Sequence, residues 1–150
     1  MKRRRFVATV GAMLALPVRA IAQPGRAHVD PIDPLIWSFT RGRPVQPGRV
    51  TLELPMMAES GHSVAMTVTV ASPMTETDYV KAIHLISEKN PVRDLATFYV
   101  GPRAGRAEVS SRIRLNGTQR MLAIAELSDG SFWSGAVDIE VMQPACTDEG

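Results

Sequence analysis

Apolar and polar residues alternate with a period of two along most of the chain between residues 50 and 141. The alternation is strongest at 50–54, 64–70, 109–115 and 137–141, and further β-rich runs occupy 79–87, 96–100 and 118–127. Alternation of this kind places one face of a strand in the core and the other in solvent. About seven short strands at this spacing predict an all-β fold, an immunoglobulin-like antiparallel β-sandwich.

Two glycine dipeptides follow the later strands. Asn116-Gly117 comes directly after 109–115, and Asp129-Gly130 comes after 118–127. Such dipeptides favour the positive φ angles of tight hairpin turns, so antiparallel pairing is predicted across both. The run 118–127 is apolar on both faces around its middle, which predicts a central strand. Pro144 has no amide proton to donate, so strand pairing is expected to end near it.

The first 22 residues have the layout of a secretory leader. A basic run at 2–5 precedes an apolar run at 6–16, and Ala20-Ile21-Ala22 supplies the small residues that a signal peptidase requires. The apolar run is too short to cross a bilayer as a helix. The arginine run before Phe6 favours the twin-arginine export route, and an ordinary leader with extra positive charge is the alternative. We therefore expect an exported, periplasmic protein.

Three parts follow the leader. Residues 23–48 are polar and rich in Pro and Gly, which predicts a mobile segment with a short helical turn at an apolar cluster around Ile36. Trp37 and Phe39 of this cluster are candidates for a partner surface, with core packing as the alternative. Residues 49–142 form the predicted sandwich. Residues 143–150 form a polar tail, and termini of this kind are usually mobile.

Removal of the leader reverses the net charge. The whole chain has 17 Lys and Arg against 15 Asp and Glu, a net charge of +2. Five of the basic residues and none of the acidic ones lie in residues 1–22, so cleavage leaves 12 against 15, a net charge of −3. A basic surface for nucleic acid is therefore not supported. No second apolar run is long enough for a membrane span.

The single cysteine of the chain, Cys146, lies in the polar tail. Exported proteins usually pair their cysteines, and one cysteine cannot form an internal disulfide. A leftover cysteine in an exported chain suggests a free reactive thiol or a bond to another chain. A structural cysteine is normally buried, whereas this one follows the last strand. The position favours a thiol offered to other proteins, with an incidental surface cysteine as the alternative.

Other chemistry-bearing residues form no recognisable catalytic or metal-binding set. His28, His62 and His84 lack metal-ligand spacing, and His84 is expected to be a packing or surface residue. Arg103 and Arg106 lie in a turn-rich basic loop that could contact an anion such as a sulfur oxoanion, or else be a solvated turn. No metal and no cofactor is predicted.

Six stretches in order resemble one family of proteins. They are 49–55 (RVTLELP), 72–75 (SPMT), 78–81 with 83–84 (DYVK and IH), 88–91 (EKNP), 112–119 (RIRLNGTQ) and 125–133 (AELSDGSFW). Their order and spacing, over residues 49–133, are similar to SoxY, the cysteine-bearing subunit of the SoxYZ carrier of microbial thiosulfate oxidation. The leader is also similar to that family.

The resemblance implies a carrier subunit that is not itself an enzyme. It implies an immunoglobulin-like sandwich in a heterodimer with a SoxZ-like subunit, with sulfur intermediates held covalently on Cys146. A haem-containing enzyme would attach thiosulfate oxidatively, a hydrolase would release sulfate, and in some organisms a molybdenum-containing enzyme would oxidise the remaining sulfur. These partners would carry the catalytic groups.

The tail departs from the family's pattern. The family's tail reads Gly-Gly-Cys-Gly-Gly, whereas this chain has PACTDEG at residues 144–150. Pro144 stiffens the tail, and Asp148 and Glu149 are expected to disfavour the thiolate. Three hypotheses remain: a covalent sulfur carrier, a non-covalent adaptor that has kept the fold and lost carrier activity, and an enzyme, which has the least support.

Overall fold

Nine strands and two short helices make up residues 33–145, the part of the chain that this computed structural model describes. The helices are α1 (Pro34–Thr40) and the 3₁₀-helix η1 (Pro102–Ala104). The strands are β1 (Val45–Pro47), β2 (Val50–Glu53), β3 (Met57–Ser60), β4 (Val64–Val70), β5 (Val80–Ser87), β6 (Asp94–Tyr99), β7 (Ala107–Ile113), β8 (Gln119–Leu127) and β9 (Phe132–Gln143).

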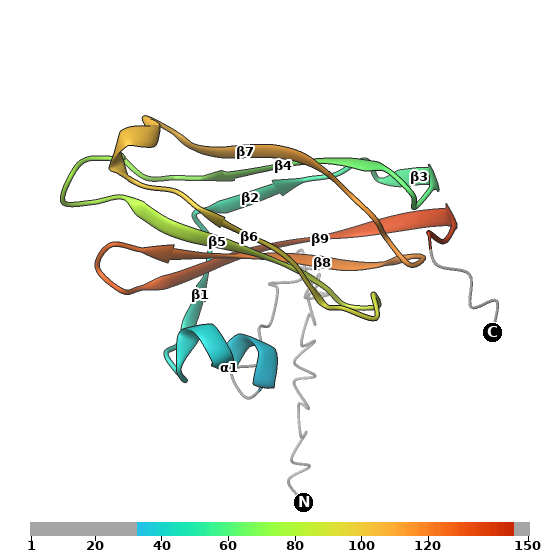
Figure 1. Cartoon of the computed structure of the whole chain (residues 1–150), viewed down its shortest axis with the longest axis horizontal. Helices are drawn as coiled ribbons and strands as arrows, with labels where there is room; N and C mark the ends of the chain where they lie inside the picture. Colours follow the sequence, from blue (N-terminus) through green and yellow to red (C-terminus); the bar gives the residue numbers. More distant parts are fainter. Residues whose placement is uncertain (1–32, 146–150) are drawn as a thin grey trace, which may run out of the picture.

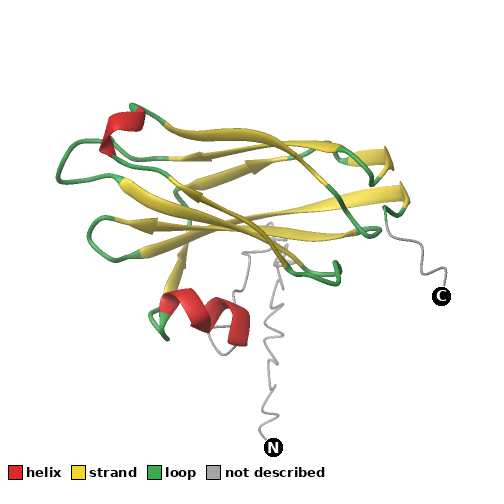
Figure 2. Cartoon of the chain, in the orientation of Figure 1, coloured by secondary structure: helices red, strands yellow, loops and turns green. Residues whose placement is uncertain are grey.

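The strands form two sheets that pack face to face (Figures 1 and 2). The larger sheet has the order β1-β9-β8-β5-β6, with β3 also paired to β9, and the smaller sheet has the order β2-β4-β7. This arrangement confirms the predicted immunoglobulin-like β-sandwich. The predicted turn at Asp129-Gly130 is also confirmed, because β8 and β9 pair antiparallel on either side of it.

The core lies between the sheets and follows the predicted alternation. Along β4 the buried residues are Val64, Met66, Val68 and Val70, and the intervening residues are more exposed. The same cluster takes Ile83 and Leu85 from β5 and Met121 from β8. Removal of one such side chain from water contributes about 1.5–3 kcal/mol to folding, so burial of this layer favours formation of the sandwich.

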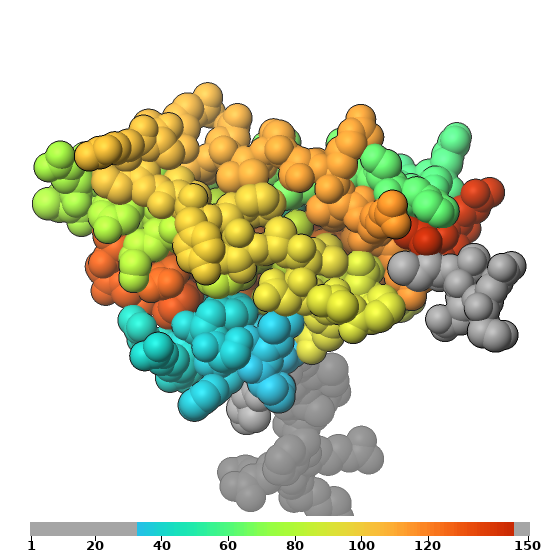
Figure 3. Space-filling view, viewed as in Figure 1, coloured from blue at the N-terminus to red at the C-terminus, as the bar shows by residue number. Residues whose placement is uncertain are grey.

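β8 is central, as predicted, and the reason is that both of its faces are covered. Its inner residues, from Met121 to Leu127, pack between the sheets. On the outer face Ile124 packs with Phe132 of β9, Ile86 of β5 and Ile36 of α1. The space-filling view shows α1 against the underside of the sandwich (Figure 3). A strand buried on both faces is apolar throughout, which is the pattern of this segment.

The hairpin predicted at Asn116-Gly117 is wrong. Gly117 does have a positive φ of 85°, yet β7 pairs with β4 in the smaller sheet while β8 pairs with β5 and β9 in the larger one. The segment after β7 therefore crosses from one sheet to the other. The turn-forming residues of a dipeptide indicate its backbone angles. They do not indicate which strand the chain pairs with next.

Two short strands were not predicted, and both run parallel to β9. β1 pairs with its first half, Val45 with Phe132, and β3 pairs with its second half, Met57 with Glu140. Part of the segment expected to be mobile is thus packed on the sandwich as α1 and β1. Residues 1–32 lie outside the described part of the chain, and so do the leader and His28.

Candidate functional site

The predicted site residue, Cys146, lies outside the described residues, which end at Ala145. The structure therefore bears on what positions the residue before the cysteine. β9 ends at Gln143, and Pro144 follows it, so strand pairing stops where the proline predicted it would. The groups that hold Gln143–Ala145 are Gly61 and Leu115, and we call these five residues the tail root.

Three backbone hydrogen bonds join the tail root. The amide of Gly61 donates to the carbonyl oxygen of Gln143 at 2.7 Å, and the amide of Ala145 donates to the carbonyl oxygen of Leu115 at 3.0 Å. The amide of Leu115 in turn donates to the carbonyl oxygen of Gly61 at 2.8 Å. The first three residues of the expected free tail are therefore fastened to the sandwich.

Gly61 permits this contact because it has no side chain. A Cβ atom on Gly61 would lie 2.1 Å from the carbonyl oxygen of Leu115 and 3.0 Å from the amide nitrogen of Ala145. The first distance is far shorter than two non-bonded atoms tolerate, so the backbones approach this closely only at glycine. The need for Gly61 is steric, because its φ does not lie in the left-handed region.

Asn90 holds the segment around Leu115 in place from the other side. Its side-chain amide donates to the carbonyl oxygen of Arg114 at 2.8 Å, and its side-chain oxygen accepts from the amide of Asn116 at 2.9 Å. The side-chain amide of Gln119 donates to the same Asn90 oxygen at 3.1 Å. Buried or half-buried amide groups satisfied in this way fix one geometry. Leu115 is therefore a rigid acceptor for the Ala145 amide.

The buried Gln119 continues this network into β5. Ser87 donates its hydroxyl to the Gln119 side-chain oxygen, and the amide of Lys89 donates to the same oxygen at 3.0 Å. Asn90, Asn116 and Gln119 all belong to stretches that carry the sequence resemblance. The structure brings two of these stretches, 88–91 and 112–119, together beside the tail root. Their common task is positioning, because none of these amide groups can act as a nucleophile.

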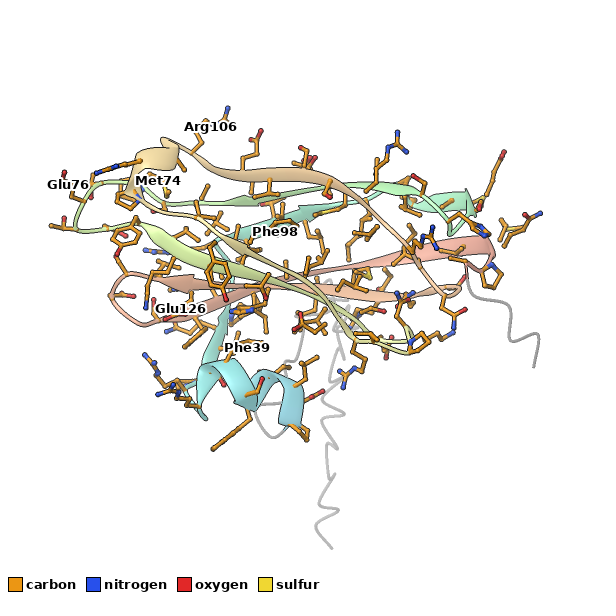
Figure 4. The ribbon with its side chains drawn as sticks, in the orientation of Figure 1. Phe39, Met74, Glu76, Phe98, Arg106 and Glu126 are labelled. Carbon is orange, nitrogen blue, oxygen red and sulfur yellow. The ribbon has the colours of Figure 1, made fainter. Side chains whose placement is uncertain are left out.

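Arg103 and Arg106 are far from the tail root. They lie in and after η1, at the start of β7, whereas Leu115 follows the end of β7 (Figure 1). Seven residues of strand separate these ends by about 23 Å. Arg106 pairs with Glu108 at 2.9 Å, and in Figure 4 it lies near Met74 at the end of the sandwich away from the C-terminus. Both arginines line an open groove of about 440 Å³ with Tyr99.

His84 packs, as predicted. It is 8% exposed, stacks on Phe39, and its Nδ1 lies 3.0 Å from the Thr97 hydroxyl. Burial lowers the pKa of His84, and the nearby charges of Asp94 and Glu126 oppose that shift. A neutral imidazole is the form that this environment favours. Phe39 is thus a packing residue, whereas Trp37 is 56% exposed.

Within residues 33–145 no group of three or more His, Cys, Asp or Glu side chains is arranged to hold a metal ion. His62 lies next to Gly61 and its Nδ1 is 3.0 Å from the Ser60 hydroxyl. In this described part, moreover, no helix has the length and apolar character to cross a membrane.

What the site provides is a rigid platform at the end of β9, built to hold the residue that precedes Cys146.

Comparison with known proteins bears on this platform. A sequence profile described as sulfur oxidation protein SoxY matches residues 38–146, which is most of the chain. The chain belongs to the SoxY family. The match reaches Cys146, so the tail root lies inside the matched region. Membership in this family supports a sulfur carrier role. No curated protein sequence matches the chain.

Solved structures share the fold. The sulfur carrier protein SoxY from Chlorobium limicola f thiosulfatophilum superposes with a TM-score of 0.61 and 24% identity, covering 71% of this chain and 92% of that one. A superoxide reductase (neelaredoxin) from Ignicoccus hospitalis superposes with a TM-score of 0.56 and 18% identity, covering 63% and 80%. At these identities the likeness is one of fold.

Gly61 and Leu115 are the positioning residues that sequence reasoning missed. No local pattern marks Gly61, because its two close neighbours come from distant parts of the chain. The stretch 112–119 was singled out by resemblance, and its place beside the end of β9 follows only from the crossing between sheets.

Proposed function

We propose that the protein is an exported sulfur carrier that holds thiosulfate-derived intermediates covalently on Cys146. The observation that carries this proposal is that the SoxY match extends through residue 146, where the only cysteine of the chain stands. The rigid tail root supports the proposal, because a carrier must present one residue reproducibly to several enzymes. Groups suited to catalysis are expected in the partners.

The proposed chemistry has two balanced steps. In the first, the thiol and thiosulfate join through a new sulfur–sulfur bond, and one proton and two electrons leave. A haem-containing partner enzyme would accept those electrons. In the second, water cleaves the bond between the outer sulfur and the sulfonate, which leaves as sulfate, and a persulfide stays on Cys146. A hydrolase would catalyse this step, and a molybdenum-containing enzyme could then oxidise the persulfide sulfur.

We further propose a SoxZ-like subunit as the permanent partner and the periplasm as the place of action. The leader at residues 1–22 supports export, with cleavage after Ala22. N-terminal sequencing of the protein from the periplasmic fraction tests this: a first residue of Gln23 is expected. Recovery of the uncleaved chain from the cytoplasm would contradict export.

Intact mass spectrometry tests the carrier chemistry. The exported protein is purified from cells grown with and without thiosulfate, in its wild-type form and as Cys146→Ser. The wild type from thiosulfate-grown cells is expected to carry sulfur-containing mass additions that map to Cys146 and disappear with reductant. The serine variant is expected to carry none and to unfold at the same urea concentration, because Cys146 follows the last residue of the tail root.

The altered tail, PACTDEG, favours one alternative, a non-covalent adaptor that keeps the fold and the partner surface. In that case Cys146 is unmodified under both growth conditions, a SoxZ-like subunit copurifies, and Cys146→Ser does not slow thiosulfate oxidation by the cells. That set of results would overturn the carrier proposal.

A further inference from the structure

The tail root restricts where an enzyme can meet Cys146. The amide of Ala145 is bonded to Leu115, and a trans peptide sets consecutive Cα atoms about 3.8 Å apart. While the Ala145 amide is bonded to Leu115, the residue that precedes Cys146 is fixed on the sandwich. An enzyme that reacts with the cysteine must therefore contact the sandwich itself, at the end where β9 finishes.

Exposed methionines gather at this same end. Met56, Met57 and Met142 are 88%, 56% and 66% exposed, and we call them the methionine edge. Of the six large apolar side chains that are exposed among residues 33–145, Met57 and Met142 lie on the paired strands β3 and β9, and Met56 directly precedes β3. Met142 directly precedes Gln143 of the tail root.

Strand pairing puts the side chains of Met57 and Met142 on one face. Met57 lies opposite Glu140 in the parallel β3–β9 pair, so the two point to the same face. Met142 is two residues beyond Glu140 and shares that face. The amide of Glu140 donates to the carbonyl oxygen of Met56 at 3.0 Å, which fixes the start of β3 against β9. Met56 and Met57 line an open groove of about 410 Å³ with Thr118 and residues 138–140.

Methionine suits a surface that meets several partners in turn. Its unbranched, polarizable side chain adapts to differently shaped apolar surfaces, and it is common at binding sites that accept many partners. Exposed apolar side chains that gather in one patch mark interaction sites more often than single ones, which are normal on a protein surface. Glu59 and Glu140 lie on the same two strands and add negative charge.

We propose that the methionine edge is the docking surface for the enzymes that react with Cys146. This inference rests on the proposed function. The partner surface it fits is an apolar collar around an active-site opening, flanked by Lys or Arg side chains that face Glu59 and Glu140. Docking there brings the opening to the residue after Ala145 without release of the tail root.

The test compares two double variants in cells grown with thiosulfate. Met57→Gln with Met142→Gln keeps the side-chain length and removes the apolar contact. The matched control is Val92→Gln with Tyr99→Gln, which changes two side chains that are 69% and 86% exposed and that lie in the loop before β6 and at the end of β6, outside β3 and β9. The fraction of Cys146 that carries sulfur is measured by mass spectrometry at fixed times after thiosulfate is added. Alkylation of the purified, reduced proteins by iodoacetamide reports the reactivity of the thiol itself.

The methionine variant is expected to load roughly ten-fold more slowly, as when one interface hot spot is lost, while its alkylation rate and the control's loading rate equal the wild type's. Equal loading of the methionine variant and the wild type would overturn the docking surface and leave the carrier function standing. A wild type that never loads would overturn the carrier function, and the docking surface with it. Loss of a SoxZ-like subunit from the methionine variant on native mass spectrometry would assign this edge to the subunit interface and also overturn the proposal.

Discussion

The imidazole ring of His84 is stacked on the ring of Phe39, with ring centroids 4.0 Å apart and an angle of 11° between the ring planes. One ring comes from β5 and the other from α1, so the stack joins the helix to the outer face of the larger sheet. The Nε2 atom of His84 is buried and has no hydrogen-bond partner among residues 33–145. A proton on both ring nitrogens would bury a charge there, which is costly.

Acid is therefore expected to weaken the fold through His84. Burial lowers the pKa of His84 in the folded chain, whereas in the unfolded chain the imidazole titrates near its ordinary value, about 6.5. Above that pH both states are neutral. Below it the unfolded state binds the proton first, so the free energy of unfolding falls as the pH is lowered. Urea unfolding between pH 8 and pH 5 measures the slope of the free energy of unfolding against pH.

His84→Gln is expected to flatten that slope, although it costs stability of its own at every pH. The exposed His62 provides the control, since His62→Gln leaves the burial of His84 unchanged. A slope in His84→Gln as steep as in the wild type would show that the acid sensitivity arises elsewhere.

Gly61→Ala is expected to lower the free energy of unfolding by about 1–3 kcal/mol, because the new Cβ would collide with the backbone oxygen of Leu115. The Ala145 amide should also lose protection from hydrogen exchange. Gly101→Ala is the matched control: a Cβ there meets nothing within 4 Å, and its φ of 177° is ordinary extended backbone. The control should stay within about 0.5 kcal/mol of the wild type. Identical urea midpoints for the two variants would contradict the close approach at Gly61.

Asp33 begins α1 and also ties it to Arg93. One carboxylate oxygen accepts the Leu35 amide at 2.9 Å and the other accepts Arg93 at 2.7 Å. The hydrogen bond from Arg93 is the main reason that the pKa of Asp33 is lowered. Its ionised form therefore stabilises the fold above the unfolded value, near 3.9, and this contribution disappears as the pH falls through the lower folded value.

Asp33→Ala should lower the free energy of unfolding by about 1 kcal/mol at pH 7 through loss of the cap. Asp33→Asn keeps an oxygen that can accept from the Leu35 amide. Its free energy of unfolding should fall by less than that of Asp33→Ala, since a partly exposed ion pair contributes little. The difference in the free energy of unfolding between Asp33→Asn and the wild type should narrow below pH 4. Urea unfolding at pH 7 and pH 3.5 checks this, and equal losses for Ala and Asn would argue against a capping role.

Ile36 is the residue through which α1 packs on the sheet. It is 3% exposed and contacts the cluster of Ile86, Ile124 and Phe132. Ile36→Ala should lower the free energy of unfolding by about 2 kcal/mol, the low end for a buried isoleucine because a short surface helix can settle into the gap. Trp37 lies on the exposed side of α1, so Trp37→Ala should lower the free energy of unfolding by less than Ile36→Ala does. Calorimetry or urea unfolding of both variants gives the comparison, and the reverse order would mean that α1 packs through Trp37.

Strand positions were predictable where one face of a strand is buried against the other sheet. The alternation at 64–70 corresponds residue by residue to β4, and the two-sided apolar run of 118–127 corresponds to β8, whose outer face α1 covers. β1 and β3 were missed because each pairs with β9 at an edge and buries few apolar groups. The pairing error after β7 has the same origin: Asn116-Gly117 specifies a local bend, whereas the choice of sheet depends on contacts with distant strands.

The site was predictable only as a cysteine in a tail. That the tail is fastened as far as Ala145 depends on the absence of a side chain at Gly61 and on an amide network that begins at Asn90. Neither residue is near Cys146 in sequence. Long-range hydrogen bonds between backbone groups leave no trace in hydropathy, so only the structure could reveal them.

β9 also determines how the molecule bears tension. It pairs antiparallel with β8 from Phe132 to Ile139, and it is flanked on its other side by β1 near its start and β3 near its end. An enzyme that pulls on residue 146 as it departs would drag β9 along its own axis. Hydrogen bonds perpendicular to that axis are then loaded together in shear, not opened one after another as in a zipper. The strand that leads into the cysteine-bearing tail is therefore held against force along its axis by hydrogen bonds that act together.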